Sequence, residues 1–153
     1  MTTAHIMFGG NTGDVDKTFR EAEKYLVDRN VVIEQSSRTG TSAAVDCVPD
    51  TPDFKDKAYR ILWHGSAEAL LDLLQETERH FGRPSDHRSD MSRTLDCDLI
   101  FFGNEVINTE RLTVPHPRMH ERMFVLELMI ETAPDYIHPT LKKTVRELYN
   151  ALA

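Results

Sequence analysis

The sequence predicts an α+β fold: a ferredoxin-like βαββαβ sandwich, followed by a C-terminal hairpin and additional helices. One observation is that short apolar segments alternate with longer segments whose apolar residues recur every three or four positions, so strands and helices take turns along the chain. Another is that no internal repeat, low-complexity tract or linker-like stretch divides the 153 residues. We therefore expect a single domain over residues 1–153 with one core.

The first half of the chain carries the signals for three strands and one helix. A glycine-rich turn at 9–13 ends the first strand, and Asp14 or Asp16 can cap the helix that follows. Apolar residues from Phe19 to Leu26 recur at helical spacing. In chain order we expect a strand at 4–8, a helix to about residue 29, a strand beginning at 31–33, a long loop at 40–53 and a strand at 54–63.

The second half places helices before and after the strongest strand. The apolar stripe of the first helix consists of Leu70, Leu71, Leu74 and Phe81. Thr144 and Glu147 form a capping box that opens the last helix, which should bury Val145, Leu148 and Leu152. In chain order we expect a helix from Ser66 to Gly82, a polar loop at 83–94, a strand at 95–102, a turn at 103–104 into 105–107, a helix at about 122–131 and the last helix.

The composition limits the classes of function. A net charge of −7 disfavours a protein that binds nucleic-acid backbones, although a few converging arginines would still suit a small anionic substrate. Cys47 and Cys97 lack the spacing of metal ligands, and we interpret them as reduced thiols. Neither a signal-peptide pattern nor a run of about 18 apolar residues is present. We therefore expect a soluble cytoplasmic protein with no nucleic-acid, membrane or obligate protein partner.

The most informative motif, RTLDCDLIFFG, begins at Arg93. Residues two apart on a strand point to the same face, so Asp96 and Asp98 present neighbouring carboxylates. A divalent cation would offset their repulsion, and oxygen ligands favour magnesium or manganese. Arg83 and Arg88 precede them in a polar loop, where guanidinium groups suit phosphate oxygens. This set is typical of phosphoryl transfer, and an exposed loop of salt-bridged arginines is the alternative.

A second motif, RLTVPHPRMHER, begins at Arg111 and gathers basic and hydroxyl side chains around two prolines. Such side chains on a rigid turn suit the binding of a polyanion. His116 and His120 are four apart, which is also a spacing for metal ligands on a helix. Pro117 and the lack of a third ligand nearby argue against that alternative.

Together the two motifs resemble the 6-hydroxymethyl-7,8-dihydropterin pyrophosphokinase family of folate biosynthesis. The resemblance is strongest over RTLDCDLIFFGNEVINTERLTVPHPRMHERMFVLELMIETAPDYIHP, and it extends more weakly over nearly the whole chain, including residues 9–11, 52–54 and 81–83. It implies an ATP-dependent pyrophosphokinase that transfers pyrophosphate from ATP to the hydroxymethyl group of the pterin and releases AMP. It also implies two Mg²⁺ ions, and ATP and a small pterin as the binding partners.

The resemblance implies roles for individual residues. Asp96 and Asp98 correspond to the carboxylates that hold both magnesium ions, and Arg83 and Arg93 correspond to arginines that bind phosphate. We expect these four to be catalytic. The positions that bind ATP correspond to Gln75, Glu78, Arg111, Thr113, His116 and Arg122. The positions that bind the pterin correspond to Phe54, Asp56 and Phe124.

Departures from the family are concentrated on the pterin side. Asp56 stands where the family has an asparagine, residues 90–92 replace its Trp-Gly-Pro, and residues 41–43 replace its Thr-Pro-Pro. A carboxylate accepts from two adjacent N–H groups of a pterin but does not donate to the ring carbonyl. We therefore hypothesise a pocket that tolerates a modified pterin or binds the usual one weakly, with ordinary divergence as the alternative. A related phosphoryl or pyrophosphoryl transferase and a non-catalytic paralogue also stay open.

Overall fold

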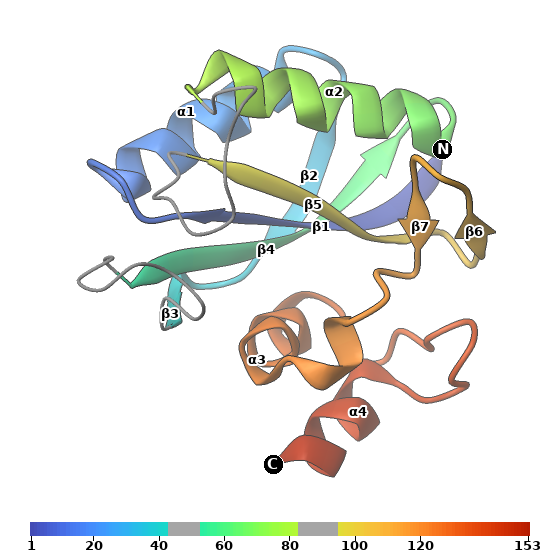
Figure 1. Ribbon diagram of the computed structural model, residues 1–153. Coiled ribbons are helices and arrows are strands. Elements are labelled where there is room, and N and C mark those ends of the chain that lie inside the picture. Colours follow the sequence, from blue (N-terminus) through green and yellow to red (C-terminus); the bar gives the residue numbers. More distant parts are fainter. Residues whose placement is uncertain (43–52, 83–94) are drawn as a thin grey trace.

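An antiparallel sheet forms the centre of the protein and carries helices on both faces. The structure is a computed structural model that describes residues 1–42, 53–82 and 95–153. Helices α1 (Val15–Val27) and α2 (Ala67–His80) cover one face of the sheet, and α3 (Met123–Thr132) and α4 (Val145–Leu152) lie on the other (Figure 1). Cys47, Arg83 and Arg93 lie outside the described residues.

The main sheet has the strand order β2-β4-β1-β5, and every pair in it is antiparallel. Its strands are β1 (Thr2–Gly10), β2 (Val32–Ser36), β3 (Gly40–Ser42), β4 (Phe54–Trp63) and β5 (Asp96–Phe102), with β3 paired to β4. A separate two-stranded sheet joins β6 (Ile107–Asn108) to β7 (Thr113–Val114), and a short 3-10 helix (Met119–Glu121) precedes α3. The predicted α+β architecture is confirmed.

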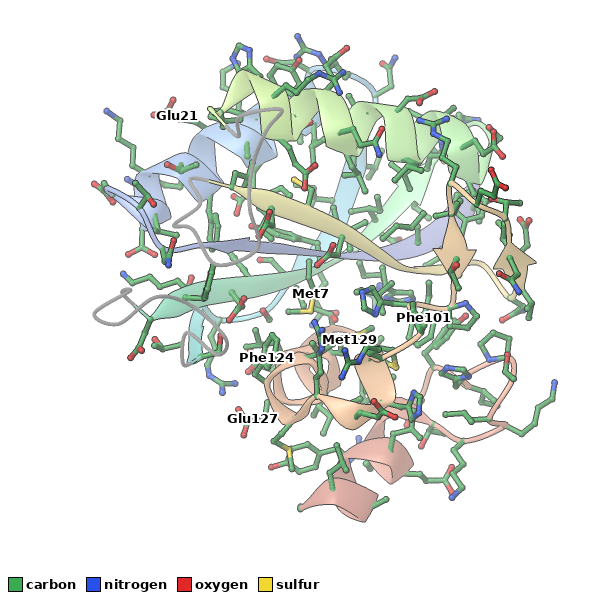
Figure 2. The ribbon with its side chains drawn as sticks, in the orientation of Figure 1. Met7, Glu21, Phe101, Phe124, Glu127 and Met129 are labelled. Atoms are coloured by element: carbon green, nitrogen blue, oxygen red, sulfur yellow. The ribbon has the colours of Figure 1, made fainter. Side chains whose placement is uncertain are left out.

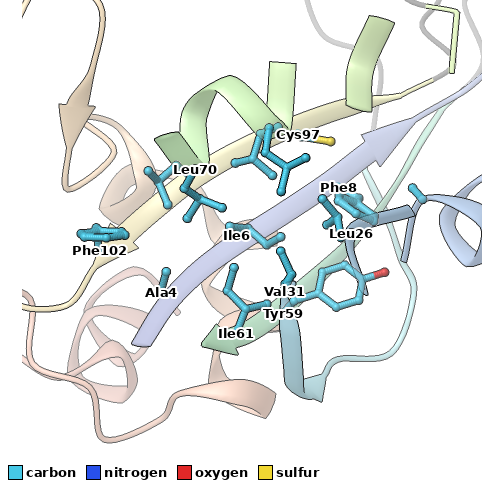
Figure 3. Close-up of a cluster of buried hydrophobic side chains, with 14 of the residues drawn as sticks. Ala4, Ile6, Phe8, Leu26, Val31, Tyr59, Ile61, Leu70, Cys97 and Phe102 are labelled. Atoms are coloured by element: carbon cyan, nitrogen blue, oxygen red, sulfur yellow. The ribbon is translucent and has the colours of Figure 1, made fainter. Parts of the chain in front are cut away.

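The face of the sheet beneath α1 and α2 forms the larger core (Figure 3). Alternate residues of β1, namely Ala4, Ile6 and Phe8, point into it because side chains alternate along a strand. The helices begin where the sequence predicts: the Asp14 side chain accepts from Lys17 N, and the Ser66 side chain accepts from Ala69 N. The buried face of each helix follows the 3.6-residue period, which holds both helices on this side of the sheet.

The opposite face forms a second core under α3 and α4, and a β-bulge in β5 shapes it. Ile6 pairs with Leu99 and His5 pairs with Phe101, so Ile100 is an extra residue on β5. Ile100 and Phe101 therefore both contact the α3 and α4 side, whereas alternation without the bulge would turn Phe101 toward α2. Figure 2 shows Met7 and Phe101 directed from the sheet toward α3, where Met129 lies.

Two of the expected elements differ from the structure. Residues 40–42, predicted to be loop, form strand β3, because pairing with β4 stabilises a segment whose own residues give no strand signal. Residues 105–106 do not continue into a strand after the turn at 103–104. The hairpin instead consists of β6 and β7, and its turn is closed by a hydrogen bond from Thr109 N to Leu112 O (2.9 Å).

Individual side chains also differ from the prediction. On α2, Leu73 is buried and Leu71 only partly so. On α4 the capping box of Thr144 and Glu147 is present as predicted, but Leu152 is exposed, because Tyr149 instead packs beside Val145 and Leu148 in the final turns. The Cys97 side chain is buried in the core beneath α2. No helix in the described ranges is both long and apolar enough to cross a membrane.

His5 lies in the second core, between aromatic rings. Its ring centroid is 4.9 Å from that of Tyr136 and 5.8 Å from that of Phe101, and neither ring nitrogen has a hydrogen-bond partner among the described residues. Burial, with a smaller contribution from the charge of Arg60, lowers the pKa of His5 from 6.5 to about 4. The fold therefore holds His5 neutral.

We expect the free energy of unfolding to fall as the pH drops from about 6.5 to about 4. Over that range the unfolded chain binds a proton at His5 that the folded chain does not bind, so stability present above pH 6.5 is lost on acidification. The pKa difference corresponds to about 3 kcal/mol at most. Urea unfolding at several pH values measures it, and His5→Phe, which keeps an aromatic ring here, should lose this part of the pH dependence. An unchanged pH profile in His5→Phe would contradict the assignment.

Candidate active site

A cavity of about 440 Å³ opens between the sheet and the start of α3. It lies on the face that α3 and α4 cover only in part, and Met7 forms part of its floor with Phe124 at its side (Figure 2). The residues that line it come from strands β1, β3, β4 and β5, from the segment leading into α3 and from the first turn of α3. They are Met7, Phe8, Gly9, Ser42, Phe54, Asp56, Asp96, Asp98, Ile100, His116, Arg118, Met119, Arg122, Phe124 and Val125.

Asp96 and Asp98 both line this cavity, as the alternation along β5 predicts. Cys97, between them, points to the opposite face and belongs to the core beneath α2. Across the sheet Asp98 is paired with Met7 and Asp96 with Gly9. The sheet thus presents two carboxylates side by side at the edge of the cavity.

Asp56 adds a third carboxylate from β4. Gly9 is paired with both Asp56 and Asp96, so the two acids flank one glycine of β1. The Ser42 hydroxyl donates to Asp56 Oδ2 at 2.8 Å. A Cβ atom on Gly9 would lie 3.1 Å from Asp56 Oδ1, so the missing side chain leaves space for this carboxylate.

The pKa of Asp56 is raised from 3.8 to about 6. Burial is the main cause, since Asp56 is only 7% exposed, and the charges of Asp98 and Asp96 raise it further. The hydrogen bond from Ser42 acts in the opposite direction, because it stabilises the charged form. A ligand with N–H donors or positive charge would lower the free energy of this buried carboxylate.

Basic side chains enter the cavity from the segment before α3. The backbone N–H of His116 donates to Ile100 O at 2.9 Å, which ties this segment to β5. His116 Nδ1 accepts from Arg118 N at 3.3 Å, so the proton of the neutral ring resides on Nε2. Burial lowers the pKa of His116; Asp98 raises it, and Arg122 and Arg118 lower it. His116, Arg118 and Arg122 therefore offer N–H donors beside the carboxylates.

Two aromatic side chains complete the cavity near Asp56. Phe54 lies two residues before Asp56 on β4 and so shares its face of the sheet, and Phe124 lies in the first turn of α3. Both rings are partly exposed. Flat apolar surfaces beside a buried carboxylate suit a planar heterocycle that carries N–H groups.

The remaining residues expected to bind ATP do not line this cavity. Arg111 forms an ion pair with Asp72 and donates to Gln75 Oε1 at 3.3 Å, so these residues gather at the exposed side of α2. Thr113 is exposed on β7. Glu78 is buried, and its Oε2 accepts from the backbone N–H of Cys97 at 2.8 Å. Only His116 and Arg122 of the expected ATP-binding residues enter the cavity.

Sequence reasoning did not assign Ser42, Gly9, Met7 or Arg118 to the site. The contact of Ser42 with Asp56 depends on the pairing of β3 with β4, and three residues of Gly, Thr and Ser give no strand signal. The sequence predicts that Gly9 begins a turn, whereas it lies in β1 and pairs with both Asp56 and Asp96. Arg118 was part of the second basic motif, without a role of its own.

The donor set of the cavity fits a magnesium ion that is held partly by a substrate. Within the described ranges no group of three or more His, Cys, Asp or Glu side chains could hold a metal ion. Asp96 and Asp98 therefore supply two carboxylates and no complete cage. Magnesium is commonly bound by one or two carboxylates together with phosphate oxygens and water.

Comparison with known proteins points to one family. The family model of 7,8-dihydro-6-hydroxymethylpterin-pyrophosphokinase (HPPK) matches residues 5–134. The 2-amino-4-hydroxy-6-hydroxymethyldihydropteridine pyrophosphokinase of Haemophilus influenzae is 35% identical over 160 residues, which cover 100% of this chain and 94% of the relative. The enzyme of the same name from Bacillus subtilis is 36% identical over 132 residues, covering 84% of this chain and 76% of the relative.

Solved structures resemble the fold. The wild-type HPPK-DHPS of Plasmodium falciparum, crystallised with SDX-DHP, superposes with a TM-score of 0.74 at 14% identity. The match covers 99% of this chain and 43% of that chain, so the present chain spans less than half of the larger protein. At that identity the likeness shows the fold alone.

We expect Ser42→Ala to raise the pKa of Asp56 further above about 6. The substitution removes the hydrogen bond that favours the charged carboxylate and leaves the burial in place. Titration of the Asp56 carboxyl carbon by NMR measures this pKa. Thr41→Ala, on the same short strand, is the matched control and should leave the pKa unchanged. A lower pKa in Ser42→Ala would contradict the geometry.

Proposed function

Because this chain belongs to the 7,8-dihydro-6-hydroxymethylpterin-pyrophosphokinase family, the ATP-dependent pyrophosphokinases of folate biosynthesis, we propose that it acts at the cavity between the sheet and α3. Its reaction is the transfer of pyrophosphate from ATP to the hydroxymethyl group of 6-hydroxymethyl-7,8-dihydropterin. The observation that carries this assignment is the joint presence of Asp96 and Asp98, basic N–H donors and two aromatic rings around one cavity.

The residues proposed to bind the triphosphate lie on β5 and on the segment before α3. Asp96 and Asp98 would hold two Mg²⁺ ions, which supply charge neutralisation for the triphosphate when bound. His116 Nε2–H and the Arg122 guanidinium donate to phosphate oxygens and orient the chain of phosphates. Positioning and charge neutralisation account for most of the catalysis in transfers of this class.

The chemical step needs no covalent enzyme intermediate. The hydroxymethyl group of the pterin loses its O–H proton to water, and its oxygen forms a bond to the β-phosphorus of ATP. The bond between that phosphorus and the oxygen bridging to the α-phosphorus breaks. AMP leaves with the bridging oxygen. Arg83 and Arg93, which lie outside the described residues, are proposed to bind the transferred phosphates. Gln75, Arg111 and Thr113 are proposed to lie on the nucleotide side, whereas Glu78, which the resemblance also assigns to that side, contacts the backbone of β5.

The pterin is proposed to bind between Phe54 and Phe124, with its pyrimidine edge toward Asp56. The relatives act on a 2-amino-4-hydroxy pteridine, whose amino group and adjacent ring N–H are two neighbouring donors. Asp56 is proposed to accept both, because the bond from Ser42 uses only one acceptor site of Oδ2 and leaves further sites on the two carboxylate oxygens. The ring carbonyl gains no donor from an ionised aspartate. We therefore propose weaker binding of the usual pterin than an asparagine would give.

The finer description of the fold is part of the same proposal. The order β2-β4-β1-β5, with antiparallel pairs and both α1 and α2 on one face, supports a ferredoxin-like βαββαβ arrangement. We also propose that residues 1–153 form one domain, since both faces of one sheet supply the two cores.

The activity is tested by incubating the protein with ATP, magnesium and 6-hydroxymethyl-7,8-dihydropterin. We expect AMP and no ADP; ADP would instead indicate a phosphoryl transferase, and neither product a non-catalytic paralogue. Asp96→Ala and Asp98→Ala should each reduce turnover at least about 100-fold, because charge neutralisation of the triphosphate is lost. Circular dichroism should show an unchanged fold. Normal turnover in either variant would exclude the metal role.

The pterin side is tested separately with Asp56→Asn. An amide at this position keeps an acceptor and adds a donor for the ring carbonyl, so affinity for 6-hydroxymethyl-7,8-dihydropterin should rise by about tenfold. Fluorescence titration of the pterin in the presence of a non-hydrolysable ATP analogue measures it. Unchanged or weaker affinity would show that the aspartate at position 56 is an ordinary sequence difference from the family, and that other groups recognise the pterin ring.

A further inference from the structure

Among the described residues, no strand lies beside the outer edge of β5 in the sheet, yet β5 carries both Asp96 and Asp98. The strand order places β5 at the edge, with β1 as its strand neighbour. In an antiparallel pair a residue directs its N–H and C=O either toward the partner strand or away from it. An edge held on one side alone would leave backbone groups unpaired and the strand free to shift.

Two side elements hold this outer edge. Glu78, on α2, accepts from the backbone N–H of Cys97 through Oε2 at 2.8 Å. His116 donates its backbone N–H to Ile100 O at 2.9 Å. Asp98 lies between these two attachment points, and Asp96 directly precedes the first. The edge strand is therefore anchored on each side of Asp98.

Glu78 is unusual for a helix residue because its carboxylate is buried, with 8% of the residue exposed. Burying a carboxylate is unfavourable unless hydrogen bonds compensate the lost hydration. A hydrogen bond from a backbone N–H to a charged carboxylate is stronger than one to a neutral acceptor. The Cys97 side chain packs beneath α2 in the core that Figure 3 shows, so strand and helix meet at this residue through both its side chain and its amide.

We propose that Glu78 is a positioning residue for the metal-binding carboxylates. By fixing the amide between Asp96 and Asp98, it fixes the direction in which both side chains enter the cavity. The inference rests on the proposed role of Asp96 and Asp98, and it replaces direct contact with ATP as the main function of Glu78. A ligand that needs both carboxylates depends on their relative placement more than on either alone.

The test compares Glu78→Ala with Glu78→Gln, whose amide oxygen still accepts from Cys97 N–H. In protein without nucleotide, we expect the Cys97 amide to exchange with solvent about tenfold faster in Glu78→Ala and near the wild-type rate in Glu78→Gln. The free Mg²⁺ concentration that gives half-maximal AMP formation should rise at least about fivefold in Glu78→Ala only. KM for ATP at saturating magnesium should stay within about twofold of wild type in both.

Glu76→Gln is the matched control, because Glu76 is the neighbouring carboxylate on α2 and, in the contacts described, bonds only to Tyr25 of α1 and to Arg29 just after α1. It should leave amide exchange and magnesium dependence unchanged. If both Glu78 variants raise KM for ATP while amide exchange and magnesium dependence match wild type, Glu78 is a nucleotide contact and the proposal is wrong. If the wild-type protein forms no AMP, the proposed function is wrong instead. The comparison of amide exchange would still show whether Glu78 stabilises the Cys97 amide.

Discussion

The antiparallel pairing of β1 with both β4 and β5 is the constraint on which the site depends. Because β1 is central, its register fixes which residues of the two neighbours stand at the same level. Gly9 is the point where Asp56 and Asp96 meet across the sheet, and Met7 stands opposite Asp98. Shifting either pair by one residue would turn a carboxylate into the core beneath α1 and α2. Burial of the apolar face of the sheet therefore fixes the register that places the carboxylates on the other face.

That arrangement collects three carboxylates in one partly buried cavity, at a cost in folding free energy. The raised pKa of Asp56 is a direct sign of it, since burial and the charges of Asp98 and Asp96 all oppose ionisation. The structure offsets the cost locally through the Ser42 hydroxyl and the basic residues before α3. The proposed complex with magnesium, phosphates and a donor-bearing ring would offset the rest of this cost.

The sequence was most informative where a short local pattern determines the structure. The strand at 54–63 and the capping box of Thr144 and Glu147 match the structure, because alternation and caps act over a few residues. The shared face of Asp96 and Asp98 follows from the same two-residue period. These features need no knowledge of the rest of the chain.

The sequence did not predict features that depend on pairing between distant segments. Strand β3 exists because β4 lies beside it, and the bond between Ser42 and Asp56 follows from that register. The bulge at Ile100 decides which core receives Phe101, and nothing in an all-apolar run marks where the extra residue falls. The same limit applies to Glu78: its spacing on the helix predicts only a position, whereas its contact with Cys97 N requires α2 to lie against the edge of β5. The resemblance therefore names candidate residues, and the packing of the sheet decides which groups each of them contacts.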